Sequence, residues 1–111
     1  MRKPGVTEGF PFGEDTLVFK VKEKIFVLAN LDGDLSLNLK CDPVFALELR
    51  ERFASVTPGY HMNKRHWNTV IADNSIPEGD ILWMIDHSYI LVFDELKKNE
   101  KEKILKTKPA G

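Results

Sequence analysis

Three short runs of residues with a β-strand pattern, joined by very short connections, are the feature that most limits how this chain can fold. Thr16–Val21 and Lys24–Ala29 are rich in β-branched and aromatic residues, and only two residues separate them. Leu35–Lys40 alternates apolar and polar residues and follows the turn signal Asp32-Gly33-Asp34. Because connections this short join antiparallel neighbours, the sequence predicts a three-stranded antiparallel meander, with the leucines of the third run facing a core.

Two helices follow the meander, with one more strand between them. Asp42 is a good N-cap residue and Pro43 suits the first helical position, so we expect a helix from Pro43 to about Phe53. A strand is expected within His66–Ala72 and a second helix over Ser75–Leu96. The apolar stripes that should face the core contain Phe45, Ala46, Leu49 and Phe53 in the first helix, and Ile81, Leu82, Met84, Ile85, Tyr89, Val92 and Leu96 in the second.

The two ends of the chain carry weaker signals. Residues 3–15 contain several prolines and glycines, so no regular structure is expected there, although Phe10 and Phe12 should dock on the core. The charged residues at the other end either extend the second helix or fray. The whole pattern predicts one domain over residues 1–98 and a tail over 99–111, with a two-layer α+β fold in which helices pack on one face of an antiparallel sheet.

The net charge of the chain limits the kinds of partner it can bind. With 16 Lys and Arg against 17 Asp and Glu, the formal charge of −1 excludes a globally basic nucleic-acid binder, so attraction to a polyanion needs a local patch. No apolar run approaches the roughly 20 residues of a membrane-spanning helix, and the first residues lack the apolar core of a secretory signal. With Cys41 as the single cysteine, we expect a reducing cytoplasm and no membrane partner.

The most unusual stretch is Pro58–Val70, which combines cations with aromatic rings and holds the only Lys and Arg between Arg52 and Lys97. Cations and amides bind a phosphate backbone, and flat rings stack on bases. We therefore expect a non-enzymatic domain that binds nucleic acid, above all DNA. Its expected binding residues are Tyr60, His61, Asn63, Lys64, Arg65, His66 and Trp67. Four lysines are candidates for additional phosphate contacts: Lys20, Lys22, Lys24 and Lys40.

Two other interpretations of this stretch stay open. In a structural one, Tyr60, Met62 and Trp67 fill the core, Asn63 caps a turn, and the cations are merely solvated. In the other, the domain is a protein-binding adaptor or chaperone-like module that uses the open sheet face or a groove, because Trp, Tyr and Arg are the usual anchors of interfaces. A monomer or a weak homodimer is expected.

Signals for catalysis and metal binding are weak. Cys41 precedes a helix N-terminus, which can activate a thiolate, but the sequence shows no accompanying base, so a small core or boundary residue is the favoured interpretation. His61 and His66 are separated by a stretch that contains two cations, and these oppose a metal ion. We therefore predict no catalytic residues, no metal and no cofactor.

Several segments of the chain resemble the MmcQ/YjbR family. Pro4–Glu8 with Phe10–Gly13, Leu37–Pro43 and Asp86–Tyr89 match its pattern, and Pro58–Val70 is similar to its most distinctive signature. The resemblance covers nearly the whole chain. It implies a two-layer α+β fold similar to the type III secretion chaperones, a bacterial cytoplasmic protein, and the DNA binding through a "double wing" that is ascribed to the family. Family members usually begin with a helix before the first of these segments, and only three residues precede that segment here. Either this chain starts late, or the second helix and the tail cover the gap. An apolar strip left exposed there would favour dimerisation.

Overall fold

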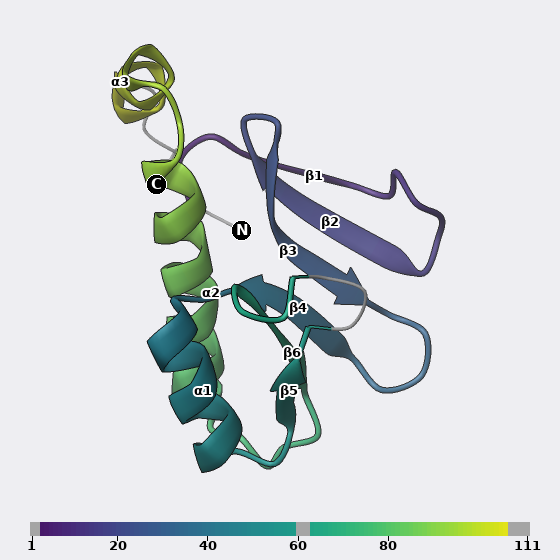
Figure 1. Cartoon of the computed structure of the whole chain (residues 1–111). Helices are drawn as coiled ribbons and strands as arrows, with labels where there is room; N and C mark the ends of the chain where they lie inside the picture. Colours follow the sequence, from purple (N-terminus) through teal and green to yellow (C-terminus); the bar gives the residue numbers. More distant parts are fainter. Residues whose placement is uncertain (1–2, 60–62, 107–111) are drawn as a thin grey trace.

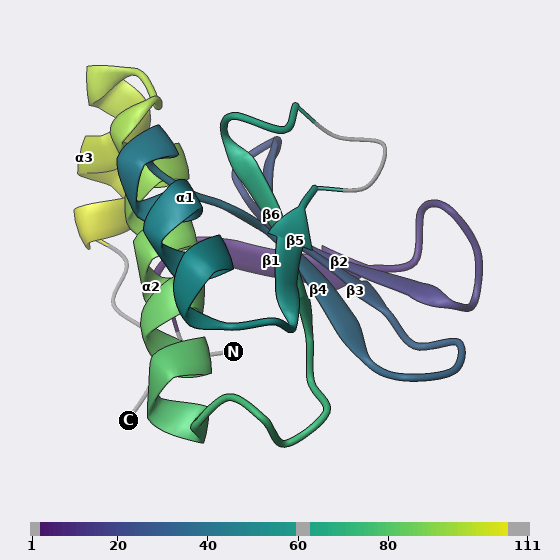
Figure 2. The same ribbon diagram turned by 60° about the horizontal axis from the view of Figure 1, so that its bottom comes forward.

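In the residues that the computed structural model describes, 3–59 and 63–106, an antiparallel sheet forms one layer and helices form the other (Figure 1). The strands are β1 (Val6–Gly9), β2 (Thr16–Val21), β3 (Lys24–Asn30), β4 (Ser36–Lys40), β5 (Val56–Pro58) and β6 (Trp67–Ile71). The helices are α1 (Pro43–Arg52), α2 (Glu78–Asp94) and α3 (Lys98–Lys106). The six strands lie in the order β1-β2-β3-β4-β6-β5, and every neighbouring pair is antiparallel. The predicted α+β architecture, with helices on one side of the sheet, is confirmed (Figure 2).

The predicted meander forms β2, β3 and β4. Lys22 and Glu23 join the first two of these strands, and Lys22 takes the left-handed backbone conformation that so tight a turn needs, with φ of 55°. Leu37 and Leu39 are buried, as their alternation predicts. Leu35 is exposed because it lies in the connection before β4 rather than in the strand, so its predicted core position is wrong.

Two short strands are present where none was predicted. β1 pairs with the edge of β2, so the expectation of no regular structure before Thr16 is wrong. The prediction that Phe10 and Phe12 dock on the core is also wrong: they are 51% and 67% exposed, because the connection from β1 to β2 extends away from the helices (Figure 2). β5 is the opposite edge strand. Pro58 has no N–H to donate to a neighbouring strand, and an edge position tolerates this because no strand of the described part of the chain lies on that side.

The core lies between the sheet and α2. The Tyr89 ring meets Phe26 edge-on, with centroids 5.3 Å apart. Ser88 is fully buried; its hydroxyl donates to the Phe26 carbonyl (2.6 Å) and accepts the Lys40 N–H (2.9 Å). This hydroxyl therefore bridges β3 and β4 just beyond the last residue pair of their ladder. The surrounding buried side chains are Val27, Ala29, Leu37, Leu39, Val70, Met84 and Val92.

α1 begins where the sequence predicts. The Asp42 side chain accepts the N–H groups of Val44 (3.0 Å) and Phe45 (3.3 Å), and Pro43 follows it directly. Ala46, from the predicted core stripe, is buried. Phe45, from the same stripe, is exposed and meets side chains of α2 instead, which corrects its predicted place in the core.

α2 is shorter than the predicted Ser75–Leu96, because Pro77 has the extended backbone of an N-cap and the helix starts after it. Leu82, predicted to widen the core stripe, is exposed. The charged segment after α2 forms a separate helix, α3, and does not extend α2. Ile104 of α3 is buried against Gly5, where an added Cβ would come within 2.9 Å of the Ile104 Cγ1. No helix in the described residues is long and apolar enough to cross a membrane.

Candidate functional site

The two ends of the sheet differ in charge, which the net charge of the chain hides. The connections from β1 to β2, from β3 to β4 and from β6 to α2 lie at one end, and the structure describes them fully; they contain no Lys or Arg. This acidic end holds Glu14, Asp15, Asp32, Asp34 and Asp73. At the other end lie the β2–β3 turn, the end of β4 and the β5–β6 connection. This cationic end holds Lys22, Lys24, Lys40, Lys64 and Arg65, and the acids beside them include Glu23, Asp42 and, from the helical layer, Glu95.

The antiparallel register gathers the cations from distant parts of the chain. Lys24 begins β3 directly after the β2–β3 turn. Lys40 ends β4 opposite Trp67, so the β5–β6 connection finishes beside the end of β4. The connection starts one strand further along the sheet, where Pro58 ends β5 opposite Asn68. Lys64 and Arg65 come from the predicted stretch. The other three cations are among the four additional lysines named from the sequence, and the strand pairing brings them to the same end of the sheet.

The predicted binding residues lie in the β5–β6 connection and at the start of β6. Tyr60 and His61 lie outside the residues that the structure describes. The Asn63 side chain accepts the N–H of Arg65 (2.9 Å), and the Asn63 carbonyl accepts the N–H of His66 (3.3 Å). Asn63 therefore caps a turn, as the structural interpretation of this stretch predicted.

Arg50 of α1, which was not predicted as a site residue, ties this connection to the helical layer. Its Nε donates to the side-chain oxygen of Asn68 at 2.7 Å, and its Nη2 donates to the carbonyls of Trp67 (3.3 Å) and Lys64. Asn68 is buried, and its amide also donates to the Ala46 carbonyl at 3.4 Å. The place of Asn68 on the buried face of β6 is the signal that points to such a partner, because a buried polar side chain needs hydrogen bonds.

Lys64 and Arg65 are exposed, and neither takes part in the four ion pairs found among residues 3–59 and 63–106. The Lys64 ammonium donates to the Gly59 carbonyl at 3.2 Å. This contact holds the side chain across the connection, and because a carbonyl is neutral, it leaves the positive charge uncompensated.

A recess of about 280 Å³ lies between α1 and the β5–β6 connection. Arg50, Lys64 and Arg65 line one part of it, and three apolar residues of α1 line the rest: Pro43, Val44 and Leu47. Among the described residues, three cations and no carboxylate therefore line one hollow, which suits an anionic group.

His66 and Trp67 are half-buried. The His66 carbonyl accepts the Cys41 N–H at 2.7 Å, which fixes the end of the connection beside the start of α1. Trp67 alternates with the buried Asn68, so strand alternation assigns it to the sheet face turned away from the helices. This placement disfavours the interpretation in which Trp67 fills the core between sheet and helices.

Two of the four additional lysines share their charge with a carboxylate. Lys24 and Lys40 both contact Glu95 after α2, with the Lys24 Nζ 3.8 Å from Oε2. These two lysines are therefore less suited to phosphate contact than predicted. Lys20 and Lys22 take part in none of the ion pairs among the described residues.

Cys41 is a buried residue, as predicted. Burial raises the pKa of its thiol to about 11, the Asp42 charge adds to the rise, and Arg50 opposes it. The thiol is protonated at neutral pH and is not an activated nucleophile. Within the part of the chain that the structure describes, no group of three or more side chains is arranged to hold a metal ion.

Other proteins are similar in sequence to this chain over most of its length. Residues 1–91 match the family model described as YjbR. The chain is 39% identical over 102 residues to the uncharacterized protein YbdF of Escherichia coli O157:H7, which covers 91% of this chain and 84% of the relative. It is 32% identical over 106 residues to the uncharacterized protein YjbR of Escherichia coli K12, which covers 95% of this chain and 89% of the relative.

Two solved structures have a similar fold. The crystal structure of the Deinococcus radiodurans protein DR2400, with the domain DUF419, gives a TM-score of 0.85 at 38% identity over 92% of this chain and 79% of that chain. A crystal structure of a Pseudomonas syringae protein gives a TM-score of 0.69 at 25% identity over 78% of this chain and 86% of that chain. The names of these relatives state no activity.

Proposed function

The chain belongs to the YjbR family, and we propose that it is a non-enzymatic cytoplasmic protein that binds nucleic acid, in particular DNA, through its cationic end. Lys64 and Arg65 contact phosphates in this proposal, and Asn63 and His66 add hydrogen bonds. Trp67 supplies an aromatic surface beside them. Tyr60 and His61, which lie outside the described residues, belong to the same set of predicted binding residues.

One observation carries the proposal: Arg50, Lys64 and Arg65 line a single recess in which no carboxylate is found in the part of the chain that the structure describes, although the net charge is −1. A local patch of this kind attracts a phosphate backbone even when the whole protein is near neutral. The acidic end of the sheet supports a defined orientation, because its carboxylates repel the same polyanion.

The hydrogen bonds within the connection support the proposal in a second way. Arg50 holds two carbonyls and the Asn68 side chain, and Asn63 closes the turn around Arg65. A surface ordered before binding loses less conformational entropy when it binds.

The test is fluorescence anisotropy with a labelled DNA duplex of about two helical turns. We expect a Kd on the order of micromolar at low salt that weakens steeply as salt rises. The double substitution Lys64→Glu with Arg65→Glu should lower the affinity by about 100-fold or more and reduce the slope of log Kd against log salt by about 2.

The matched control is Lys97→Glu with Lys98→Glu, which makes the same change in net charge on exposed residues of the α2–α3 region. Its DNA affinity should stay within about threefold of the unmodified protein. The proposal is wrong if no binding is measurable at low salt, or if both double variants lose affinity equally.

A further inference from the structure

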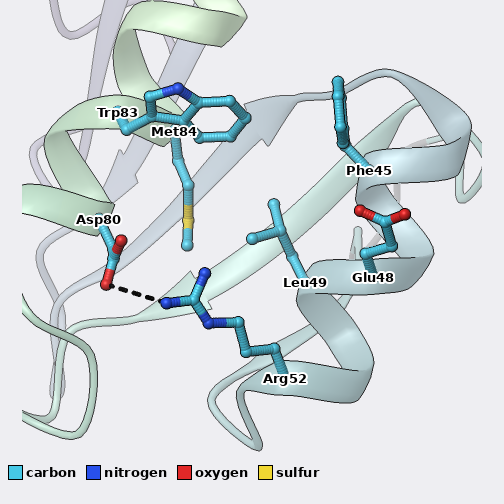
Figure 3. A pocket seen from close by; sticks show the side chains of 7 residues that line it. All are labelled: Phe45, Glu48, Leu49, Arg52, Asp80, Trp83 and Met84. Atoms are coloured by element: carbon cyan, nitrogen blue, oxygen red, sulfur yellow. Dashed lines mark ion pairs between the residues drawn. The ribbon is translucent and has the colours of Figure 1, made fainter.

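A groove of about 340 Å³ opens between α1 and α2 (Figure 3). Phe45 and Leu49 from α1, and Trp83 and Met84 from α2, supply its apolar walls. Met84 is buried, whereas Phe45 and Trp83 are 42% and 47% exposed. Large aromatic side chains exposed beside a hollow are typical of interaction surfaces and are the residues that anchor them most strongly.

The aromatic side chains of the groove are held in one arrangement. Trp83 stacks on His87, with centroids 5.0 Å apart and an interplanar angle of 7°. Phe45 meets Trp83 edge-on at 5.9 Å and His87 edge-on at 5.6 Å. The His87 Nε2 accepts the Asp42 N–H at 3.2 Å, which ties the cluster to the start of α1. The exposed rings are therefore fixed before any partner arrives, and that lowers the entropic cost of binding.

The charges around the groove are mainly negative. α2 contains no Lys or Arg; of its four acidic residues, Asp80 lines the groove and Asp86 is paired with Lys3 instead. Asp80 and Glu48 line the groove itself; Arg52, its one cation, lies 3.9 Å from Asp80. Glu48 takes part in no ion pair among the described residues. A polyanion is disfavoured here, and a partner with positive charge beside an apolar group is favoured.

The shape of the groove indicates the form of that partner. α1 and α2 lie side by side in both views (Figures 1 and 2). The furrow between two packed helices accepts the side-chain ridge of a third helix. An amphipathic helix can place an apolar side chain in the groove, against the exposed rings of Phe45 and Trp83, and a Lys or Arg one turn away, at Glu48.

We infer that the α1–α2 groove is a docking site for a basic amphipathic helix of a partner protein. This site is separate from the cationic end of the sheet and does not depend on the nucleic-acid proposal. Its anchors are Phe45 and Trp83, over Leu49 and Met84, and its charge contact is Glu48.

The probe is a pair of designed peptides of about 18 residues, about five helical turns. Both carry the same leucine pattern; one has Lys and the other has Glu on the polar face. Isothermal titration calorimetry should show that the Leu/Lys peptide binds and that the Leu/Glu peptide does not. Trp83→Ala should weaken the Leu/Lys peptide by about tenfold or more. Ile90→Ala, an exposed apolar position of α2 that does not line the groove, should leave the affinity unchanged.

The charge contact has its own matched pair. Glu48→Lys should weaken the Leu/Lys peptide, whereas Asp32→Lys makes the same change in net charge at the acidic end of the sheet and should not. Because Glu48 is exposed, this arm remains decisive if Trp83→Ala folds poorly.

Three results overturn the inference. The first is equal binding of the two peptides, and the second is an equal loss of affinity in the groove variants and their controls. The third is a dimer of the free protein, seen by light scattering, that Glu48→Lys or Trp83→Ala abolishes, because the groove then receives a second copy of this chain. The DNA affinity of Trp83→Ala, which changes no charge, should be unaltered, so failure here is distinguishable from failure of the nucleic-acid proposal.

Discussion

The cationic end of the sheet and the α1–α2 groove differ both in the charge they present and in the way the chain builds them. Lys64 and Arg65 are neighbours in the sequence, and their connection is held in place by Arg50 of a distant helix. Phe45 and Trp83 are far apart in the sequence, and they meet because two helices pack side by side. A near-neutral protein can therefore carry two surfaces of opposite character, and the net charge describes neither.

The largest expected effect is a double dissociation between the two surfaces. Lys64→Glu with Arg65→Glu should lower the DNA affinity by about 100-fold or more and leave the affinity for the Leu/Lys peptide unchanged. Trp83→Ala should have the reverse effect. Both ligands are to be titrated against both variants. If either variant loses affinity for both ligands, the two surfaces are coupled and are not independent binding sites.

The next effect concerns Arg50, which links the helical layer to the β5–β6 connection. Arg50→Ala leaves the side-chain oxygen of buried Asn68 without its donor, which should cost about 1–3 kcal/mol in urea unfolding and lower DNA affinity by about tenfold. Arg50→Lys keeps the charge but not the forked geometry that reaches three oxygens. If Arg50 acts by positioning, the Lys variant should lose nearly as much affinity as the Ala variant; full affinity in the Lys variant would show that only the charge matters.

A smaller effect should follow from Glu95, which shares the charge of Lys24 and Lys40. Glu95→Gln should raise DNA affinity by about two- to threefold at low salt, and this gain should vanish at high salt because the charges are exposed. Asp94→Asn removes a charge from the neighbouring position and is the control. An equal gain in both variants would mean that the lysines contribute only to the general field of the protein.

The smallest expected effect is a pH dependence of the free energy of unfolding, caused by His87 beside the groove. Burial lowers the pKa of His87 below its ordinary value of 6.5, and the Asp42 charge partly opposes this. The unfolded chain then binds the proton more tightly than the folded one, so the free energy of unfolding should fall as pH drops from about 6.5 through the lower folded pKa. The measurement is urea unfolding at pH 7.5 and pH 5.5, compared with His87→Gln, which should lose less stability on acidification. An identical pH dependence in the two proteins would show that protonation of His87 does not cause the loss of stability.

Several elements could be predicted because their signals are local. Thr16–Val21 forms β2 over the predicted residues, and Asp42 caps α1 through its own side chain. Both depend on residues within one short segment. β1 could not be predicted in the same way, since its hydrogen bonds go to the edge of β2 and its few residues lie between Gly5 and a terminal Gly9.

In the candidate site, too, some residues could be predicted from local sequence and others could not. Lys64 and Arg65 stand out in the sequence, and their exposure is seen in the structure. Nothing in the sequence distinguishes Arg50 from other helix residues, and its role depends on the hydrogen bond to Asn68 that the fold makes possible. Phe45 was assigned to the core because helical spacing shows that residues share a face, but not which neighbour covers that face.

The sequence by itself determined the α+β architecture, the family and the position of the basic-aromatic stretch, because strand alternation, helix caps and residue composition act over a few residues. The tertiary structure alone decided which charges share one end of the sheet, which arginine orders the connection, and which aromatic rings remain exposed between α1 and α2. The physical reason is that strand register and helix packing bring distant residues within a few ångströms of each other, and hydrogen bonds, charge and burial act at those distances.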